Sequence, residues 1–248
     1  MIDLHCHLLW DMDDGASSME KTVQMCQTAV ENDIQIIAAT PHMTDLRTLD
    51  DFLYLRNRKL TELVRILQAE KIPVQVCGGA EVFLNEWIFE VGDELEELTL
   101  NRSRYLLCEY SLRPFDPEKA IVFAEEVLER GLIPIIAHPE RYPTFHEYPE
   151  IVTELHSLGA RFQVNAESLT GRIGESVQTF ATALLTNGLA DVLATDAHGV
   201  THRKNDFKAM QTMFPSALSP EIVRYTTHTV PLCILKNEPL PHNPRLKA

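Results

Sequence analysis

Seven short apolar runs alternate along the chain with longer amphipathic segments, and this alternation constrains the fold more than any other feature. Several runs are apolar at consecutive positions, which is typical of parallel strands buried on both faces. The runs cover residues 2–4, 34–39, 74–77, 105–109, 133–137, 161–164 and 192–195. This order predicts an α/β fold whose parallel strands close into a (β/α) barrel rather than an open doubly wound sheet, with one domain over residues 1–248.

Helix signals lie between the apolar runs. Ser17 and Glu20 have the spacing of a capping box, and apolar residues then recur on one helical face as far as Val30. Pro117 is suited to the start of a helix and Gly131 to its end. Further helices are predicted over residues 50–70, 148–158, 175–187 and 204–213.

Composition excludes several classes of partner. The chain has 22 Lys and Arg against 36 Asp and Glu, a formal net charge of −14, so we expect no nucleic-acid partner and no binding to anionic membranes. No segment approaches the length of apolar sequence that crosses a bilayer, and residues 1–5 lack the pattern of a signal peptide. The 5 cysteines are scattered and form no Cys-x-x-Cys pair, which favours free thiols and a cytoplasmic protein.

Histidines and carboxylates follow six of the seven runs. They are Asp3, His5 and His7 at the first run, His42 at the second, Glu81 at the third, Glu109 at the fourth, His138 at the fifth, and Asp196 and His198 at the seventh. The carboxyl ends of barrel strands form one face, where active sites are built. A single histidine at a strand end is more often structural than a ligand, but independent structural histidines would not all occupy the same edge.

The His5-Cys6-His7 segment has the geometry of a metal site. Side chains at positions i and i+2 of a strand point the same way, so both imidazoles can bind one ion. Imidazole with carboxylate suits Zn²⁺, Mn²⁺ or Fe²⁺, and bridging carboxylates can hold two ions about 3.5–4 Å apart. The residues therefore predict a metal centre of more than one ion.

These motifs together resemble the polymerase and histidinol phosphatase (PHP) superfamily. The resemblance rests on Asp-x-His-x-His at residues 3–7, Thr-Pro-His at 40–42, Gly-Ala-Glu at 79–81, His-Pro-Glu-Arg at 138–141 and Asp-Ala-His at 196–198. Met-Asp-Asp-Gly-Ala at 12–16 and His-Pro-Glu-Arg-Tyr at 138–142 are similar to one branch, the metal-dependent bacterial protein-tyrosine phosphatases of capsule and exopolysaccharide synthesis. The similarity extends to about residue 215.

The resemblance implies a distorted, TIM-like (β/α)7 barrel of the PHP type with three divalent metal ions, Mn²⁺ first and Fe or Zn²⁺ as alternatives. It implies that the first ion is held by His5, His7 and Asp196. It implies that Glu81 bridges this ion to a second, which Glu109 and His138 complete, and that Asp14, His42 and His198 hold the third. Arg141 and Arg203 match arginines that bind the substrate phosphate.

The activity that this resemblance implies is hydrolysis of a phosphomonoester by a metal-activated hydroxide, without a phosphoenzyme. Thiol-based tyrosine phosphatases carry Arg six positions after their nucleophilic Cys. The residues at that offset here are Met12, Asn32, Phe83, Pro114 and Pro239. By the same resemblance the partner is a tyrosine-phosphorylated protein, a bacterial tyrosine kinase, which would approach over a basic rim near Arg141 and Arg203.

Three other functions fit parts of the pattern. A phosphatase of the same superfamily could act on histidinol phosphate or another small phosphoester. A metal-dependent amidohydrolase also begins with His-x-His but usually adds a bridging Lys, and no Lys follows any of the seven runs. A non-enzymatic metal-binding scaffold would be expected to lose ligands first, whereas this ligand set is intact. The sequence leaves the native metal, the physiological substrate, the oligomeric state and the role of the segment after about residue 220 open.

Overall fold

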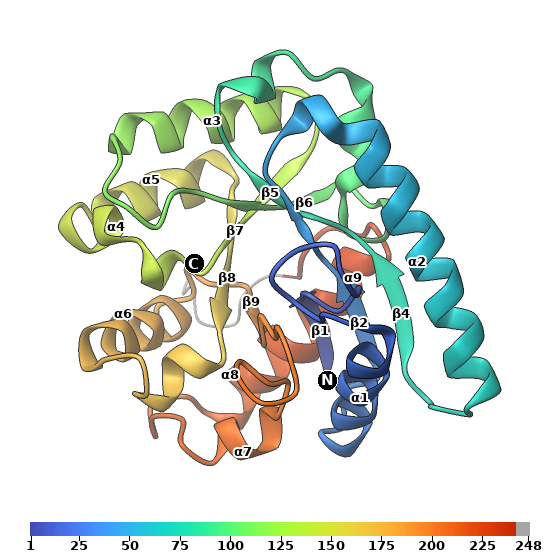
Figure 1. Cartoon of the computed structure of the whole chain (residues 1–248). Coiled ribbons are helices and arrows are strands. Elements are labelled where there is room, and N and C mark those ends of the chain that lie inside the picture. The colour runs from blue at the N-terminus through green and yellow to red at the C-terminus, as the bar shows by residue number, and fades with distance from the viewer. Residues whose placement is uncertain (242–248) are drawn as a thin grey trace.

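The computed structural model describes residues 1–241 and shows parallel strands surrounded by helices (Figure 1). The strands are β1 (Ile2–Cys6), β2 (Ile36–Ala39), β3 (His42–Met43), β4 (Gln75–Gly78), β5 (Glu81–Phe83), β6 (Tyr105–Glu109), β7 (Ile133–Ala137), β8 (Arg161–Asn165) and β9 (Val192–Ala194). The α-helices are α1 (Met19–Glu31), α2 (Leu49–Ala69), α3 (Pro117–Glu129), α4 (Pro143–Glu147), α5 (Glu150–Leu158), α6 (Glu175–Thr186), α7 (Phe207–Gln211), α8 (Pro220–Arg224) and α9 (Val230–Leu235).

The nine strands occupy seven positions around a barrel, because β3 continues β2 and β5 continues β4. One sheet has the order β1-β2-β4 and the other the order β3-β5-β6-β7-β8-β9. Gly79 donates its N–H to Ala39 O at 3.0 Å and Glu81 donates to Pro41 O at 3.1 Å, which carries the ladder across both breaks. The predicted α/β fold with parallel strands is confirmed, and the two broken strands account for the distortion of the barrel.

The barrel closes between β1 and the chain that follows β9. Asp196 donates its N–H to His5 O at 2.8 Å, and His7 donates its N–H to Ala197 O at 2.8 Å. Asp3 is fully buried beside this seam, where its carboxylate accepts the N–H and the hydroxyl of Thr195. Burial raises the pKa of Asp3 to about 6. The first residue of the Asp-x-His-x-His motif therefore joins the two ends of the barrel wall.

The helices follow from local signals, with small corrections to the predicted boundaries. Ser18 rather than Ser17 caps α1, accepting the N–H of Lys21 at 3.3 Å. Asp116 caps α3, where Pro117 occupies the first turn as predicted. The helix predicted over residues 204–213 is shorter in the structure, where it is α7. Residues 204–206 form a loop instead, and the side-chain amide of Asn205 in this loop donates to Met25 O in α1 at 2.9 Å.

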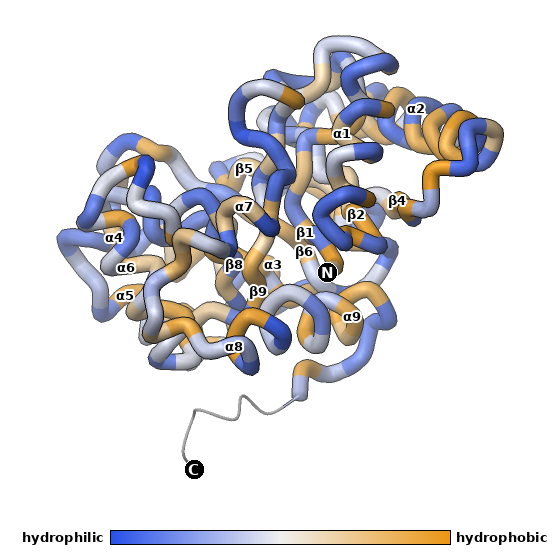
Figure 2. The backbone as a smooth tube through the Cα atoms, turned by 90° about the horizontal axis from the view of Figure 1, so that it is seen from below, coloured by the Kyte–Doolittle hydropathy of each residue, from blue (hydrophilic) through white to orange (hydrophobic). Residues whose placement is uncertain are grey.

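The C-terminal segment closes the amino end of the barrel, a role that the sequence left open. A buried apolar cluster contains Leu4, Leu107, Ala137, Ala194, Val230 and Ile234. Leu107 lies two positions before Glu109 in β6, so the two side chains share a face of the sheet. Helix α9 lies beside β1 (Figure 2), and Tyr105 at the start of β6 donates its hydroxyl to Glu238 O at 2.9 Å. The apolar interior thus leaves only the carboxyl end of the barrel for polar chemistry.

We expect Asp3→Ala to lower the free energy of unfolding of the metal-free protein by about 1–3 kcal/mol, because two buried donors of Thr195 lose their acceptor. Denaturation in urea at neutral pH measures this change. The matched control is Glu125→Ala on the exposed face of α3, which should change the free energy by less than about 0.5 kcal/mol. An Asp3→Ala protein as stable as the control would contradict the role of this contact in closing the barrel.

Candidate metal centre

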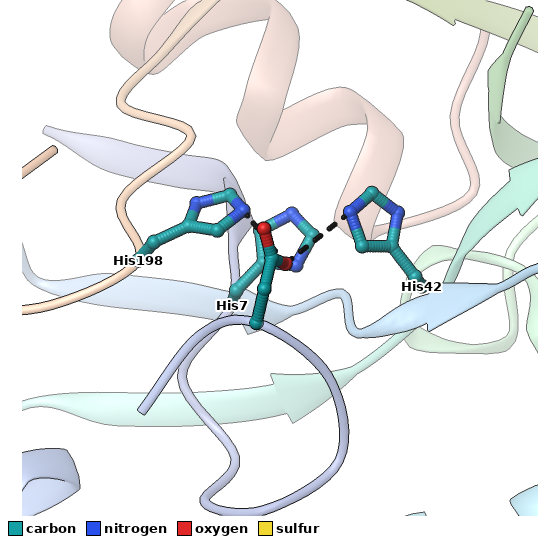
Figure 3. Close-up of side chains that lie close together, drawn as sticks. His7, His42 and His198 are labelled. Carbon is teal, nitrogen blue, oxygen red and sulfur yellow. Dashed lines mark ion pairs between the residues drawn. The ribbon is translucent and has the colours of Figure 1, made fainter. Parts of the chain in front are cut away.

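The structure brings all nine predicted ligands together at the carboxyl end of the barrel. They come from β1 and the loop after it, from β3, β5 and β6, and from the loops after β7 and β9: His5, His7, Asp14, His42, Glu81, Glu109, His138, Asp196 and His198. Figure 3 shows His7, His42 and His198 converging from three different segments. Apart from Asp14 and His42, these side chains are almost entirely buried.

Two histidines and two carboxylates form the deepest group of donor atoms. His5 Nε2 and His7 Nε2 lie 3.2 Å apart. Glu81 Oε2 lies 3.1 and 3.2 Å from these two nitrogens, and Asp196 Oδ1 lies 3.3 and 3.4 Å from them. Such separations are those between ligands of one ion whose bonds are about 2.0–2.2 Å long.

A second and a third group share members with the first. His42 Nδ1 lies 3.1 Å from Glu81 Oε2 and 2.9 Å from Glu109 Oε1. Glu81 Oε1 lies 2.8 Å from His138 Nε2, so its two oxygens face different histidines, as a bridging carboxylate requires. Asp14 Oδ1 lies 3.6 Å from His42 Nε2 and 3.3 Å from His198 Nε2, and this carboxylate is the exposed member of the outermost group.

The polar atoms that lack partners identify what the site accommodates. Glu81 Oε2, Asp196 Oδ1 and His42 Nδ1 are buried beside other donor atoms of the cluster, but none of them has a well-directed hydrogen bond. A divalent cation would satisfy these atoms together. The donor set of imidazole nitrogens and carboxylate oxygens suits Mn²⁺, Fe²⁺ or Zn²⁺. The residues therefore fit the metal ions that the sequence predicts.

Protons compete with metal for these donors. Burial alone would lower the pKa of His5, but the carboxylates of Glu81 and Asp196 raise it to about 9. Burial would raise the pKa of the Glu81 and Asp196 carboxyls, but His5 and His7 hold both pKa values well below their usual range. His198 behaves oppositely, because burial and the neighbouring His7 lower its pKa to about 4. Metal binding must release protons from the deep group, whereas His198 presents a neutral imidazole.

Residues in contact with the ligands were missed by the sequence analysis. Asp13 Oδ2 lies 2.7 Å from His7 Nδ1 and accepts the N–H of His42 at 2.9 Å. The hydrogen bond from His7 lowers the pKa of Asp13 to about 2 in spite of burial. Gln163 Oε1 lies 2.7 Å from His5 Nδ1. Hydrogen bonds of this kind fix the orientation of a ligating imidazole and increase its basicity.

A buried chain of amides continues from Gln163 to Asp196. Gln163 Nε2 donates to Asn165 Oδ1 at 2.8 Å, and Asn165 Nδ2 donates to Asp196 Oδ2 at 2.6 Å. Glu140 anchors this chain, since its Oε1 accepts the N–H of Asn165 at 2.9 Å and the hydroxyl of Ser168 at 2.6 Å. The Glu of the His-Pro-Glu-Arg motif thus supports β8 instead of facing the metal ligands.

The two predicted arginines meet at the same carboxylate oxygen. Arg203 Nη2 contacts Asp196 Oδ2, and Arg141 Nη1 lies 3.4 Å from this atom. Arg203 Nη1 also lies 3.0 Å from His198 Nε2. Both guanidinium groups line a cavity of about 360 Å³ beside the donor atoms. A phosphoryl group between the arginines and the metal ligands would find cationic partners on both sides.

A parallel barrel whose carboxyl end gathers histidines, carboxylates and arginines belongs to the class of metal-dependent hydrolase barrels. A family model described as capsular polysaccharide synthesis, CpsB/CapC, matches residues 1–236. The chain belongs to the CpsB/CapC family, and the resemblance seen in the sequence is confirmed.

Individual relatives agree with this assignment. The chain is 34% identical over 205 residues to tyrosine-protein phosphatase YwqE of Bacillus subtilis, covering 82% of this chain and 79% of the relative. It is 27% identical over 214 residues to tyrosine-protein phosphatase CpsB of Streptococcus pneumoniae, covering 82% and 85%. A crystal structure from work on YwqE and CpsB, described as unique metal-dependent tyrosine phosphatases, superposes with a TM-score of 0.85 and 28% identity over 98% of both chains.

A more distant structure shares only the fold. The phosphotriesterase homology protein of Escherichia coli matches with a TM-score of 0.53 and 10% identity over 94% of both chains. This likeness supports the barrel architecture and carries no information about substrate.

We expect Gln163→Leu to weaken metal binding by about 10- to 100-fold, because the imidazole of His5 loses the partner that orients it. Titration of the metal-free protein with Mn²⁺ by calorimetry measures the affinity directly. Gln68→Leu on the exposed face of α2 serves as the control and should bind Mn²⁺ like the wild type. Equal affinities of the Gln163 variant and the control would show that this contact does not orient the ligand.

Proposed function

We propose that this chain is a metal-dependent tyrosine-protein phosphatase of the capsule-synthesis type, which removes phosphate from phosphotyrosine in a protein. The observation that carries the proposal is the placement of Arg141 and Arg203 on one oxygen of Asp196, while its other oxygen faces His5 and His7. An anion-binding pair thereby adjoins a set of metal ligands. The names of the family's YwqE and CpsB members point to the same activity.

The proposed ligand set has three parts. His5, His7 and Asp196 would hold one ion, Glu81 would share it with a second held also by Glu109 and His138, and Asp14, His42 and His198 would hold the third. The donor chemistry accepts three divalent ions, with Mn²⁺ preferred and Fe or Zn²⁺ as substitutes. When bound, such ions supply Lewis acidity and lower the pKa of water towards neutrality.

The protein's own contribution is to bind and orient the phosphomonoester. Arg141 and Arg203 are placed to hold phosphoryl oxygens, where charge is concentrated, and to keep the phosphorus beside the metal ligands. Asn165 Nδ2 donates to the same oxygen of Asp196, Oδ2, at 2.6 Å and helps to fix this carboxylate. Water then displaces the phenolate of tyrosine in line, so no covalent intermediate with the protein is needed.

No cysteine among the described residues is prepared to act as the nucleophile. Burial raises the pKa of Cys6 and Cys108 well above the usual thiol range, and it raises the pKa of Cys26 and Cys77 to about 12. Cys6 lies between two predicted ligands, but its Sγ donates to Ala197 O in the barrel wall at 3.7 Å. Burial also raises the pKa of Cys233, which is only partly buried in α9, so each of the five thiols is a weaker acid than a free cysteine.

The physiological substrate that we propose is a tyrosine-phosphorylated protein, namely a bacterial tyrosine kinase. A cytoplasmic site of action is supported by the 5 free cysteines. Among residues 1–241, no helix is long and apolar enough to cross a membrane. The alternative, a phosphatase for histidinol phosphate or another small phosphoester, would use the same cluster with a different leaving group, so direct comparison of substrates separates the two.

Metal removal is the primary test. After chelation we expect hydrolysis of p-nitrophenyl phosphate and of a phosphotyrosine peptide to be lost, and Mn²⁺ to restore both. His42→Ala should reduce the restored activity at least about 100-fold, whereas Cys6→Ser and Cys108→Ser retain it. A phosphatase that resists chelation and is inactivated by thiol alkylation would overturn the proposal, and preference for histidinol phosphate would favour the alternative.

Arg203→Gln should raise the KM for the phosphotyrosine peptide, with a loss of about 10- to 100-fold in kcat/KM, because a charge-assisted contact to the phosphate is removed. Metal content by elemental analysis must accompany the kinetics, since Arg203 also contacts the predicted ligands Asp196 and His198. Arg172→Gln, which replaces an exposed arginine on the neighbouring loop, is the control. An unchanged KM at full metal content would exclude a phosphate-binding role for Arg203.

A further inference from the structure

The cavity beside Asp196 combines two chemically different walls with further polar groups. Arg141 and Arg203 form its cationic wall and Ile173 and Val177 its apolar wall, and the lining is completed by Asn165, Glu167, Ser168 and Thr195. Its volume of about 360 Å³ exceeds the roughly 150 Å³ of a protein cavity known to hold benzene, and it falls within the range of small-molecule sites. A ligand with one anionic end and one apolar end would match these walls.

The loop that leads into α6 and the first turn of this helix carry the two side chains of the apolar wall. Ile173 stands between Gly171 and Gly174, whose φ values of +77° and +124° are readily adopted by glycine. Its side chain remains 44% exposed, which is high for isoleucine. Val177 follows four positions later in the first turn of α6, and it too is only partly buried. These two side chains present apolar surface to solvent beside two guanidinium groups.

The position of the arginines sets the direction of a bound ester. Both reach Asp196 Oδ2, while Oδ1 of the same residue faces His5 and His7. A phosphate held by these arginines lies at the boundary between the metal ligands and the cavity. Its ester substituent must point away from the buried ligands, and the cavity is the adjoining space.

We propose that Ile173 and Val177 bind the aromatic ring of the phosphotyrosine side chain and thereby strengthen the binding of aryl phosphomonoesters. This inference rests on the proposed phosphatase function and adds the part of the site that recognises the leaving group. The ring replaces water on both aliphatic side chains, and the apolar area removed from water strengthens binding. Inorganic phosphate, which has no substituent, gains nothing from this wall.

Binding of two probes to the Mn²⁺-loaded protein tests the inference without turnover. Calorimetry with phenylphosphonate and with inorganic phosphate gives a Kd for each. We expect Ile173→Ser to raise the Kd for phenylphosphonate about tenfold and to change that for phosphate less than twofold, whereas Ile173→Leu restores aryl binding. Leu158→Ser, which replaces an aliphatic side chain of similar exposure (41%) on α5, should change neither.

An unchanged Kd for phenylphosphonate in Ile173→Ser would overturn the inference, as would an equal rise for both probes. Failure of the wild type to hydrolyse phenyl phosphate is a separate result, because it would contradict the proposed function while the binding comparison could still be made. Selective loss of the aryl probe in an enzyme that hydrolyses phenyl phosphate supports both.

Discussion

The arrangement of the site depends on the interactions of the Asp196 carboxylate. One of its oxygens faces two buried histidines, and the other receives Arg141, Arg203 and the amide of Asn165. Its position follows from the closure of the barrel, because the N–H of Asp196 is bonded to the carbonyl of His5 on the first strand. Candidate metal ligands from the two ends of the barrel wall are therefore brought together where β1 meets the segment after β9.

This arrangement concentrates ionisable groups where water is excluded. Without a cation, buried histidines and carboxylates stabilise one another in charged form, which is why the pKa of His5 rises to about 9 while those of Glu81 and Asp196 fall. Breaking any one partner leaves an uncompensated charge, and such changes cost more than the loss of one contact. Metal binding replaces protons by ions in the same positions, so metal affinity, pH and folding stability are linked in this protein.

Much of the barrel and the gathering of the nine candidate ligands could be predicted, because hydrophobic runs and His or acidic residues at strand ends carry direct signals. Gln163 and Asn165 were missed since the sequence analysis looked for His, Asp and Glu at the strand ends, although their i, i+2 spacing at the end of β8 repeats that of His5 and His7. The breaks between β2 and β3 and between β4 and β5 were not predicted. The role of α9 could not be predicted either, because it depends on contacts made across the whole chain.

The proposed metal ligands and the proposed leaving-group pocket are built from different parts of the fold. The candidate metal donors come from strand ends, where hydrogen bonds in the barrel wall leave little freedom. Ile173 and Val177 instead come from the loop and first turn of α6, outside the closed wall. A loop of this kind tolerates substitution better than a buried ligand cluster does. Selectivity for the leaving group can therefore change at the α6 loop while the groups that act on the phosphate remain in place.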